Sequence, residues 1–336
     1  MTTDAALATE IRRLVDGYQV SQAIHVAATL GIADSLAEGA RASDEVAQAT
    51  GTHAPTLYRL LRALASVGVL RELDHQCFEL TPLGECLRSD VPSSIADWAA
   101  FIGRPYRWQA WAELLHSVKT GEDAFRHIHG TDAWTYRSTH PDESTIFDRA
   151  MASLSRRSNT AVLAAYDFGR FQTVTDVGGG NGAFLAAVLT AHPNLRGVLF
   201  DQPHVVSGAH AVLEAAGVTN RCRVIGGSFF ESLPNGCDGY VLHTVIHDWD
   251  DGDSIRILKV VRGAIADDGT LLLIERIVAP PNGGRDAKFS DLNMLVGLGG
   301  RERTREEYAE LLHQSGFALR RITDAGIYSV IEGASA

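Results

Sequence analysis

The 336-residue sequence predicts an α/β protein with a doubly wound, Rossmann-like sheet, preceded by a helical, winged-helix-like N-terminal segment. Three observations predict it. Short apolar runs alternate with helical patterns from residue 171 onward, as in parallel sheets that carry helices on both faces. One run enters the stretch Asp-Val-Gly-Gly-Gly-Asn-Gly at residues 176–182. Residues 43–80 read as helix, turn, helix and two short strands.

Composition and charge exclude several classes of protein. The chain is 45% hydrophobic, enough for a sizeable core, and its net charge of −11 disfavours a general affinity for nucleic acid or anionic membranes. No apolar run is long enough for a membrane span, and the first residues lack the pattern of a signal peptide. The four cysteines have no CxxC spacing, so we expect a reduced cytoplasmic protein without disulfides or a zinc ribbon.

The N-terminal segment has the order of a winged helix. Residues 5–40 show helical periodicity, Ser43 begins a helix that Gly51 breaks, and the pair Ala54-Pro55 begins the next. Two short strands follow, at 69–73 and 77–80. Between residues 41 and 88 there are five arginines, no lysine and six acidic residues, which disfavours DNA binding. We therefore expect a structural, dimerising role for this segment.

The aromatic stretch from 98 to 166 is predicted to be helical and to cap the sheet domain. Trp134 and Phe147 are among its aromatic residues, and we expect both to line a substrate pocket. The predicted organisation is a dimerisation domain over 1–97 and a second domain over 98–336. This second domain divides into the cap (98–166) and the Rossmann-like core (167–336).

The core strands and the glycine turn predict a nucleotide site. The first strand, 173–177, leads into the glycines, whose backbone can approach a ligand closely, and a helix begins near Ala183. Gly178, Gly180 and Gly182 fit a methyltransferase spacing, but Gly178, Gly180 and Ala183 fit the dinucleotide pattern as well. The other predicted strands are 197–201, 223–225, 239–243 and 269–277, with two more after Gly316 and Gly326.

Asp201 ends the second strand about 20 residues after the glycines. An acid there can bind both ribose hydroxyls of a nucleoside. NAD and S-adenosylmethionine both carry that ribose, so this position leaves the cofactor open. Alternatively, Asp201 begins a turn before Pro203.

Four ordered motifs carry a family resemblance. They are Asp-Val-Gly-Gly-Gly-Asn-Gly, then Gly-Gly-Ser-Phe-Phe-Glu-Ser-Leu-Pro at 226–234, Gly-Tyr-Val-Leu-His-Thr-Val-Ile-His-Asp-Trp-Asp-Asp at 239–251, and Asp-Leu-Asn-Met-Leu-Val-Gly-Leu-Gly-Gly-Arg-Glu-Arg-Thr at 291–304. Together they resemble the S-adenosylmethionine-dependent small-molecule O-methyltransferases typified by plant caffeic acid O-methyltransferase and bacterial antibiotic-tailoring enzymes. The resemblance spans residues 17 to 332 and implies that the winged-helix segment builds a homodimer.

The resemblance also implies a cofactor site for S-adenosylmethionine, with Asp201 on the ribose and Phe229 beside the adenine. Two positions depart from the family pattern. Ser228 stands where the family has an acid that contacts adenosine, and His243 replaces a lysine or arginine. The cofactor residues implied are Asp176, Gly178, Gly180, Asp201, Gly227, Ser228, Phe229 and His243.

For catalysis, the resemblance implies that His247 is the general base and that Glu275 and Glu302 are its flanking acids. Met151 and Met294 match two methionines that sandwich the aromatic acceptor, a role suited to polarizable thioethers. Asp248, next to the base, is expected to contact the acceptor. The predicted reaction is methylation of a phenolic hydroxyl of an aromatic secondary metabolite, with no metal.

Other functions remain open at this stage. Methylation of carbon or nitrogen would use the same cofactor, and a winged-helix regulator could sense it. A dehydrogenase would need NAD instead. A metal-dependent C-methylating relative would want a further histidine near 295–300, where the sequence is Leu-Val-Gly-Leu-Gly-Gly.

Overall fold

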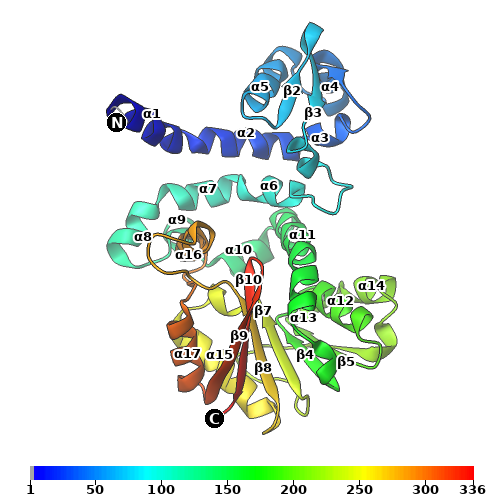
Figure 1. Ribbon diagram of the computed structural model, residues 1–336, viewed down its shortest axis with the longest axis vertical. Coiled ribbons are helices and arrows are strands. Elements are labelled where there is room, and N and C mark those ends of the chain that lie inside the picture. Colours follow the sequence, from blue (N-terminus) through cyan, green and yellow to red (C-terminus); the bar gives the residue numbers. More distant parts are fainter. Residues whose placement is uncertain (1–3) are drawn as a thin grey trace. The chain divides into compact units, whose positions relative to one another are not determined.

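The computed structural model describes residues 4–336, apart from the side chain of residue 157 (Figure 1). Its contacts divide the chain into two compact units. The first contains the residues up to 108 and 137–154, and the second contains 109–136 and 155–336. The long helix α11 (Pro141–Ala165) contributes to both. The boundary predicted at residue 97 and the cap predicted over 98–166 stay predictions about domain organisation.

The first unit begins with the winged-helix segment, whose helices α4 and α5 start where the sequence predicts. Helix α4 begins at Ser43 and ends against Gly51, whose φ of 65° suits a helix C-terminus. Helix α5 carries Leu57, Leu61 and Leu64 on one buried face. The elements are α1 (Asp4–Val15), α2 (Gly17–Thr29), α3 (Ile32–Ser35), β1 (Arg41–Ala42), α4 (Ser43–Thr50), α5 (Ala54–Ser66), β2 (Leu70–Glu72), β3 (Cys77–Leu80) and α6 (Ala96–Ile102).

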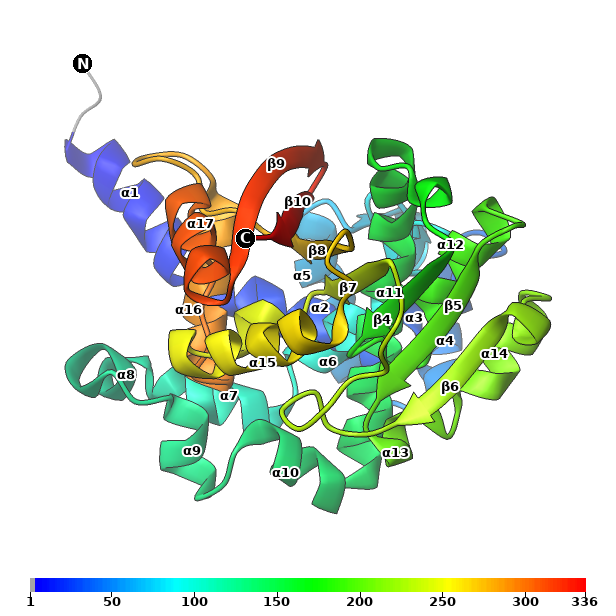
Figure 2. The same cartoon turned by 90° about the horizontal axis from the view of Figure 1, so that it is seen from below.

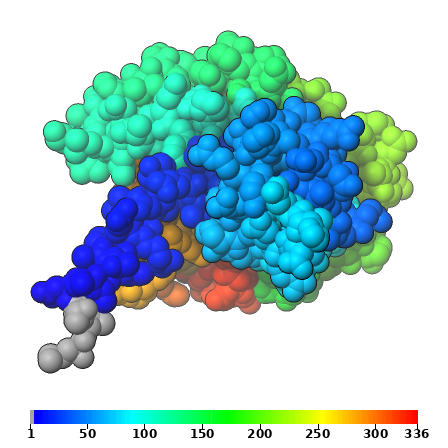
Figure 3. All heavy atoms as spheres, turned by 90° about the horizontal axis from the view of Figure 1, so that it is seen from above, coloured from blue at the N-terminus to red at the C-terminus, as the bar shows by residue number. Residues whose placement is uncertain are grey.

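The three short strands of this unit form an antiparallel sheet in the order β1-β3-β2. Helix α2 packs against the core of this segment, whereas α1 projects away from it, as the dark blue spheres of Figure 3 show. Helix α1 has no buried residue, and Leu7, Ile11 and Leu14 are each about 60% exposed. An apolar helix face of this kind marks a surface for association.

The second unit contains the seven-stranded sheet, in the order β6-β5-β4-β7-β8-β10-β9. The first five strands in this order are parallel. The strands are β4 (Thr173–Val177), β5 (Arg196–Asp201), β6 (Cys222–Gly226), β7 (Gly239–His243), β8 (Thr270–Glu275), β9 (Phe317–Ala325) and β10 (Tyr328–Ser335). The chain winds outward from β4 to β6 and then resumes beside β4 with β7. The carboxyl ends of β4 and β7 therefore flank the topological switch point, where such folds bind ligands.

Neighbouring residues along each strand face opposite sides of the sheet and enter two separate cores. Leu272 of β8 packs in the core formed with α12 (Ala183–Ala191) and α14 (Ala209–Ala215). Leu271 and Leu273 pack with α15 (Asp251–Ala264) and α17 (Arg305–Gln314). Figure 2 shows these two pairs of helices on different sides of the sheet. The remaining helices are α7 (Pro105–Ala112), α8 (Leu114–Thr120), α9 (Ala124–His129), α10 (Ala133–Thr139), α13 (Pro203–Val206) and α16 (Arg285–Gly297).

The sheet differs from the fully parallel one that the alternating pattern indicates. Strands β9 and β10 are antiparallel to each other, and β10 is antiparallel to β8. The reason is the short connection through Gly326, which can join only antiparallel strands, since a parallel pair needs a long crossover. All four cysteines are free thiols. Within residues 4–336, no helix combines the length and apolarity needed to cross a membrane.

Candidate active site

The glycine turn lies where β4 leaves the sheet. Gly178, Gly180 and Gly182 have positive φ angles of 71°, 60° and 81°, which glycine adopts without a steric penalty. The N–H of Gly178 donates to the carbonyl of Phe200 on β5 at 2.8 Å, so the turn is held against the neighbouring strand. A Cβ on Gly180 would meet no atom within 4 Å. The backbone is therefore open to a ligand on that side.

Two acidic side chains lie next to this turn. Asp201 accepts the N–H of Gly180 at 2.8 Å. Asp176 is 1% exposed, and its carboxylate oxygens have no hydrogen-bond partner in the described part of the chain. Burial raises the pKa of both carboxyls, and the charge of Asp201 adds to the rise at Asp176, whose pKa is raised to about 7. A ligand that brings positive charge or hydrogen-bond donors would stabilise this pair.

Asp176→Asn is expected to stabilise the ligand-free protein at alkaline pH. An unfolded aspartate titrates near ~3.9, whereas the pKa of Asp176 in the folded protein is raised to about 7. The folded state therefore holds the extra proton between these values, and the free energy of unfolding falls as the pH rises through this window. The loss is roughly 4 kcal/mol above the folded pKa.

Thermal unfolding at about pH 5 and about pH 8 checks this expectation. The wild-type Tm should fall more between the two conditions than the Tm of Asp176→Asn. The exposed Asp267→Asn serves as the control, because the same change of charge is made at the surface. The same fall in Tm for the wild type and Asp176→Asn would contradict it.

The segment after β6 returns to the same edge of the sheet. The N–H of Gly227 donates to the backbone carbonyl of Asp201 at 2.9 Å. A Cβ on Gly178 would lie 3.6 Å from the Phe229 ring, so this ring lies beside the glycine turn. Ser228, between them, uses its hydroxyl to accept a backbone N–H two residues on. These three residues thus lie beside the glycine turn and Asp201, and their binding of a ligand stays a prediction.

His243, at the end of β7, is 8% exposed, and its Nε2 has no hydrogen-bond partner among residues 4–336. Its ring centroid lies 4.7 Å from that of Phe184 and 5.6 Å from that of Tyr328. Burial lowers the pKa of His243 to about 4, so the imidazole is neutral near pH 7. It cannot supply the positive charge of the lysine or arginine that the resemblance places there.

A strained turn after β7 forms the centre of the site. Thr244 has a φ of 57°, an outlier for a β-branched residue of the kind found at functional sites. The N–H groups of Val245 and Ile246 that follow both donate to Oε1 of Glu275, at 3.0 and 2.8 Å. Its other oxygen, Oε2, lies 2.5 Å from Nδ1 of His247. Glu275 ends β8 and is fully buried. This carboxylate therefore fixes both the turn and the orientation of the imidazole.

The charges around His247 favour its protonated form. Burial disfavours the imidazolium, but Glu275, Asp248 and Glu302 outweigh it and raise the pKa of His247 to about 10. Nε2, on the far side of the ring from Glu275, lies 3.4 Å from Oδ1 of Asp248. Phenols titrate near pKa ~10, so the imidazole and a phenolic hydroxyl have closely matched proton affinities. Such a match favours proton transfer between them.

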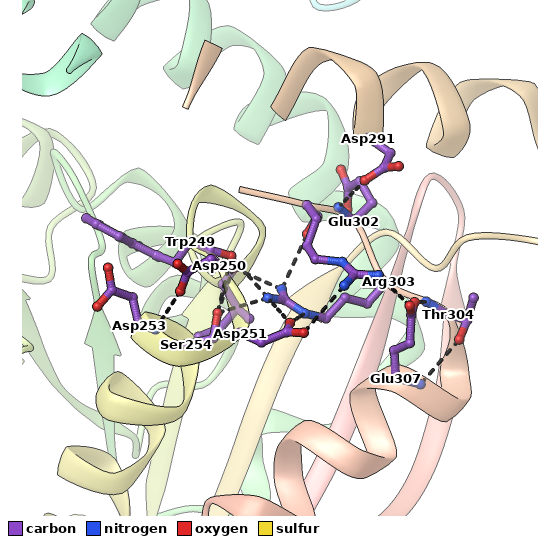
Figure 4. A network of polar contacts seen from close by, with 12 residues as sticks. Trp249, Asp250, Asp251, Asp253, Ser254, Asp291, Glu302, Arg303, Thr304 and Glu307 are labelled. Carbon is purple, nitrogen blue, oxygen red and sulfur yellow. Dashed lines mark hydrogen bonds and ion pairs between the residues drawn. The ribbon is translucent and has the colours of Figure 1, made fainter. Parts of the chain in front are cut away.

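Glu302 comes from the loop before α17. Its Oε1 accepts the hydroxyl of Ser290 at 2.7 Å and lies 3.8 Å from Nε of Arg276. The N–H of Glu302 donates to Asp291 at 3.0 Å, a bond drawn in Figure 4. Oε2 is buried and has no hydrogen-bond partner in the described residues. Burial raises the pKa of this carboxyl.

His247, Glu275 and Glu302 each have a potential ligand atom within 4.8 Å of the others, a spacing that could hold a cation. No other such cluster occurs in the described residues. However, both oxygens of Glu275 are already hydrogen-bonded, one to two backbone N–H groups and one to His247. A metal bound to Glu275 would therefore have to displace these bonds.

The predicted acceptor residues fall in different parts of the chain. Met294 lies on α16 and is 7% exposed, and Trp134 lies on α10 in the same unit. Phe147 and Met151 lie on the part of α11 that belongs to the first unit. The pairing of Met151 with Met294 across an aromatic ring stays a prediction.

Comparison with known proteins identifies the family of this chain. Residues 111–318 match the model of the O-methyltransferase domain, and residues 12–90 match that of the O-methyltransferase dimerisation domain. The chain belongs to the O-methyltransferase family. It is an enzyme that uses S-adenosylmethionine as the methyl donor.

Relatives of this O-methyltransferase cover nearly the whole chain. The phenazine O-methyltransferase PhzM of Lysobacter antibioticus is 42% identical over 97% of this chain and 96% of its own. The 8-amino-8-demethylriboflavin N,N-dimethyltransferase of Streptomyces davaonensis is 39% identical over 94% and 91%. The crystal structure of the O-methyltransferase NcsB1 from neocarzinostatin biosynthesis, in complex with S-adenosylmethionine and 2-hydroxy-5-methyl naphthoic acid, has a TM-score of 0.83 at 36% identity, covering 94% of this chain and 96% of that one.

Three residues of this O-methyltransferase contribute to the site but were not predicted. Thr244 provides the strained turn, Arg276 approaches Glu302, and Arg303 binds the turn that carries His247. Arg276 and Arg303 each follow a predicted acid directly in the sequence, and that adjacency is the only signal that could have found them. The strain at Thr244 has no sequence signature, since threonine is common at strand ends.

Proposed function

We propose that this O-methyltransferase methylates a phenolic hydroxyl of an aromatic secondary metabolite, with His247 as the general base. The observation that carries the proposal is the 2.5 Å contact between Nδ1 of His247 and the buried Glu275. A carboxylate on Nδ1 keeps that nitrogen protonated, so in the neutral imidazole, the form that acts as the base, Nε2 is the proton acceptor. Glu302 adds negative charge that stabilises the imidazolium formed when the proton arrives.

In the proposed step, the acceptor O–H bond breaks and its proton goes to Nε2 of His247. The acceptor oxygen forms a bond to the methyl carbon, while the carbon–sulfur bond breaks and its electron pair stays on sulfur. When bound, S-adenosylmethionine supplies that electrophilic methyl group on a sulfonium. The protein contributes alignment, for which well-oriented reactants gain roughly 7–11 kcal/mol.

The cofactor residues are proposed from their shared location. The glycine turn contains Gly178 and Gly180, and the side chains of Asp176 and Asp201 lie next to it. The segment after β6 lies beside the same turn. The unsatisfied carboxylate of Asp176 suits a cationic ligand, and the open face of Gly180 allows close approach. We propose that these residues bind the donor together with Gly227, Ser228, Phe229 and His243.

We propose that Met151 and Met294 clamp the aromatic ring and that Phe147, Trp134 and Asp248 complete the acceptor site within the cap at 98–166 and the core. Support for Asp248 is its 3.4 Å distance from Nε2 of His247. The exposed apolar face of α1 and the matched dimerisation domain support a homodimer. The free cysteines fit a cytoplasmic location.

The test is to incubate the purified protein with S-adenosylmethionine and a panel of phenolic and amino-substituted aromatic compounds, including phenazines and naphthoates. We expect a mass gain of one methyl group on a hydroxyl, located by NMR, and unchanged turnover in the presence of EDTA. Loss of turnover in EDTA would show that the cluster around His247 holds a metal.

Methylation of nitrogen is the second candidate, since one relative is an N,N-dimethyltransferase at 39% identity. A neutral aromatic amine needs no base before it attacks. Methylation confined to amines, with no requirement for His247, would therefore favour this candidate over the first.

A further inference from the structure

Arg303 has no exposed surface and follows Glu302 directly in the chain. Burying a guanidinium is costly unless its charge and its N–H groups are compensated. One carboxylate provides the charge: Nε and Nη2 of Arg303 donate to Oδ1 of Asp251 at 2.9 and 2.8 Å. Asp251 itself is 55% exposed, so this ion pair lies at the edge of the buried region.

Nη1 and Nη2 of Arg303 also donate to the turn that carries His247. Nη1 donates to the carbonyl of Ile246 at 3.2 Å, and Nη2 donates to the carbonyl of Trp249 at 3.0 Å. These two carbonyls bracket His247 in the sequence, and Figure 4 shows the guanidinium of Arg303 reaching toward Trp249 and Asp251. Nη2 also meets the buried hydroxyl of Ser254 at 3.1 Å.

Backbone contacts near Arg303 join its loop to the turn that carries His247 and to the residues that follow Glu275. The N–H of Arg301 donates to the carbonyl of His247 at 2.9 Å. A Cβ on Gly300 would lie 2.1 Å from that carbonyl oxygen, so the loop is packed directly on the turn. The carbonyl of Arg303 accepts the N–H of Val278, which lies three residues beyond Glu275. Arg303 and the backbone beside it thus join the segments that carry His247, Glu275 and Glu302.

We propose that Arg303 is a positioning residue, whose guanidinium fixes the turn of His247 relative to Glu302 and so aims Nε2 at the acceptor. The proposal rests on the proposed role of His247 as the base. A lysine could keep the charge next to Asp251, but its single nitrogen cannot span both carbonyls. The planar fork of the guanidinium, and not its charge alone, is therefore what the geometry requires.

The test compares Arg303→Lys and Arg303→Met with the wild type. Misplacement of a catalytic group by about 1 Å can cost about 10²-fold in rate. We expect both variants to lower kcat by about 10- to 100-fold, while KM for the acceptor and Kd for S-adenosylmethionine change by less than about threefold. Arg305 lies two residues further along the chain and is exposed, so Arg305→Lys and Arg305→Met serve as matched controls. They should stay within about twofold of the wild type.

His247→Ala and the double variant His247→Ala/Arg303→Lys complete the experiment. If Arg303 acts through His247, the double variant has the same kcat as His247→Ala. A further loss in the double variant, or a kcat of Arg303→Lys within about twofold of the wild type, would overturn the proposal. So would parallel losses of kcat, Tm and cofactor affinity, which indicate a folding role only. Unchanged kcat in His247→Ala would instead refute the proposed function.

Discussion

Glu275→Gln is expected to lower kcat by about 10³–10⁴-fold without unfolding the protein. The reason is that the two carboxylate oxygens of Glu275 bind different groups. Oε1 accepts the N–H groups of Val245 and Ile246, so the carbonyl oxygen of the glutamine is held on that side. Its amide NH₂ must then face Nδ1 of His247, which becomes a hydrogen-bond acceptor. The proton of the neutral imidazole then moves to Nε2. This nitrogen can no longer receive the proton of the acceptor, as in a catalytic triad whose aspartate is replaced by asparagine.

The measurement is kcat for a phenolic acceptor, together with Kd for S-adenosylmethionine and Tm. We expect both of the latter to stay near their wild-type values, since the hydrogen bonds to the turn are kept. The exposed Glu306→Gln is the control for the chemical change. A Glu275→Gln variant that retains more than about a tenth of wild-type kcat would show that the tautomer of His247 does not matter.

His247→Ala is expected to lower kcat by about 10²–10⁴-fold for an ordinary phenol, the usual range for general-base catalysis. Kd for S-adenosylmethionine should change little, because the glycine turn and Asp201 are separate from the imidazole. The raised pKa of about 10 sets the pH dependence. In the free enzyme His247 is protonated near pH 7, so kcat/KM of the wild type should rise with pH until the base loses its proton.

A series of phenols of increasing acidity distinguishes a base from a residue that only shapes the site. An electron-poor phenol that is already ionised at the assay pH needs no base. The deficit of His247→Ala should therefore shrink by at least about tenfold for such an acceptor, whereas the exposed His313→Ala should match the wild type throughout. An equal deficit for all phenols would assign His247 to positioning alone.

Much of the core follows from local sequence patterns. The strands 173–177 and 239–243 are observed as β4 and β7 with the predicted bounds, and α12 begins at Ala183 as expected. Apolar runs between glycine and polar residues specify such strands locally. The direction of β9 and β10 was not encoded in this way. It depends on a connection too short for a crossover, and the alternating pattern gives no sign of it.

The candidate site shows the same division. The family resemblance of the motifs implied the proposed catalytic residues, but the motifs do not say which atoms meet. The contact of Glu275 with His247 joins residues 28 positions apart, and that of Arg303 with Ile246 joins residues 57 positions apart. Such pairings depend on how strands and loops pack, and no local pattern encodes them.

The sequence by itself determined the class of the fold, the glycine turn and the residue types that S-adenosylmethionine-dependent methylation requires. Glycine conformations and strand periodicity are local properties, so they can be read along the chain. Only the tertiary structure decided that Glu275 holds both a strained turn and an imidazole, that three carboxylates raise the pKa of His247, and that a buried arginine ties these segments together. Electrostatic and hydrogen-bond energies depend on distance and burial in space, which separation along the chain does not reveal.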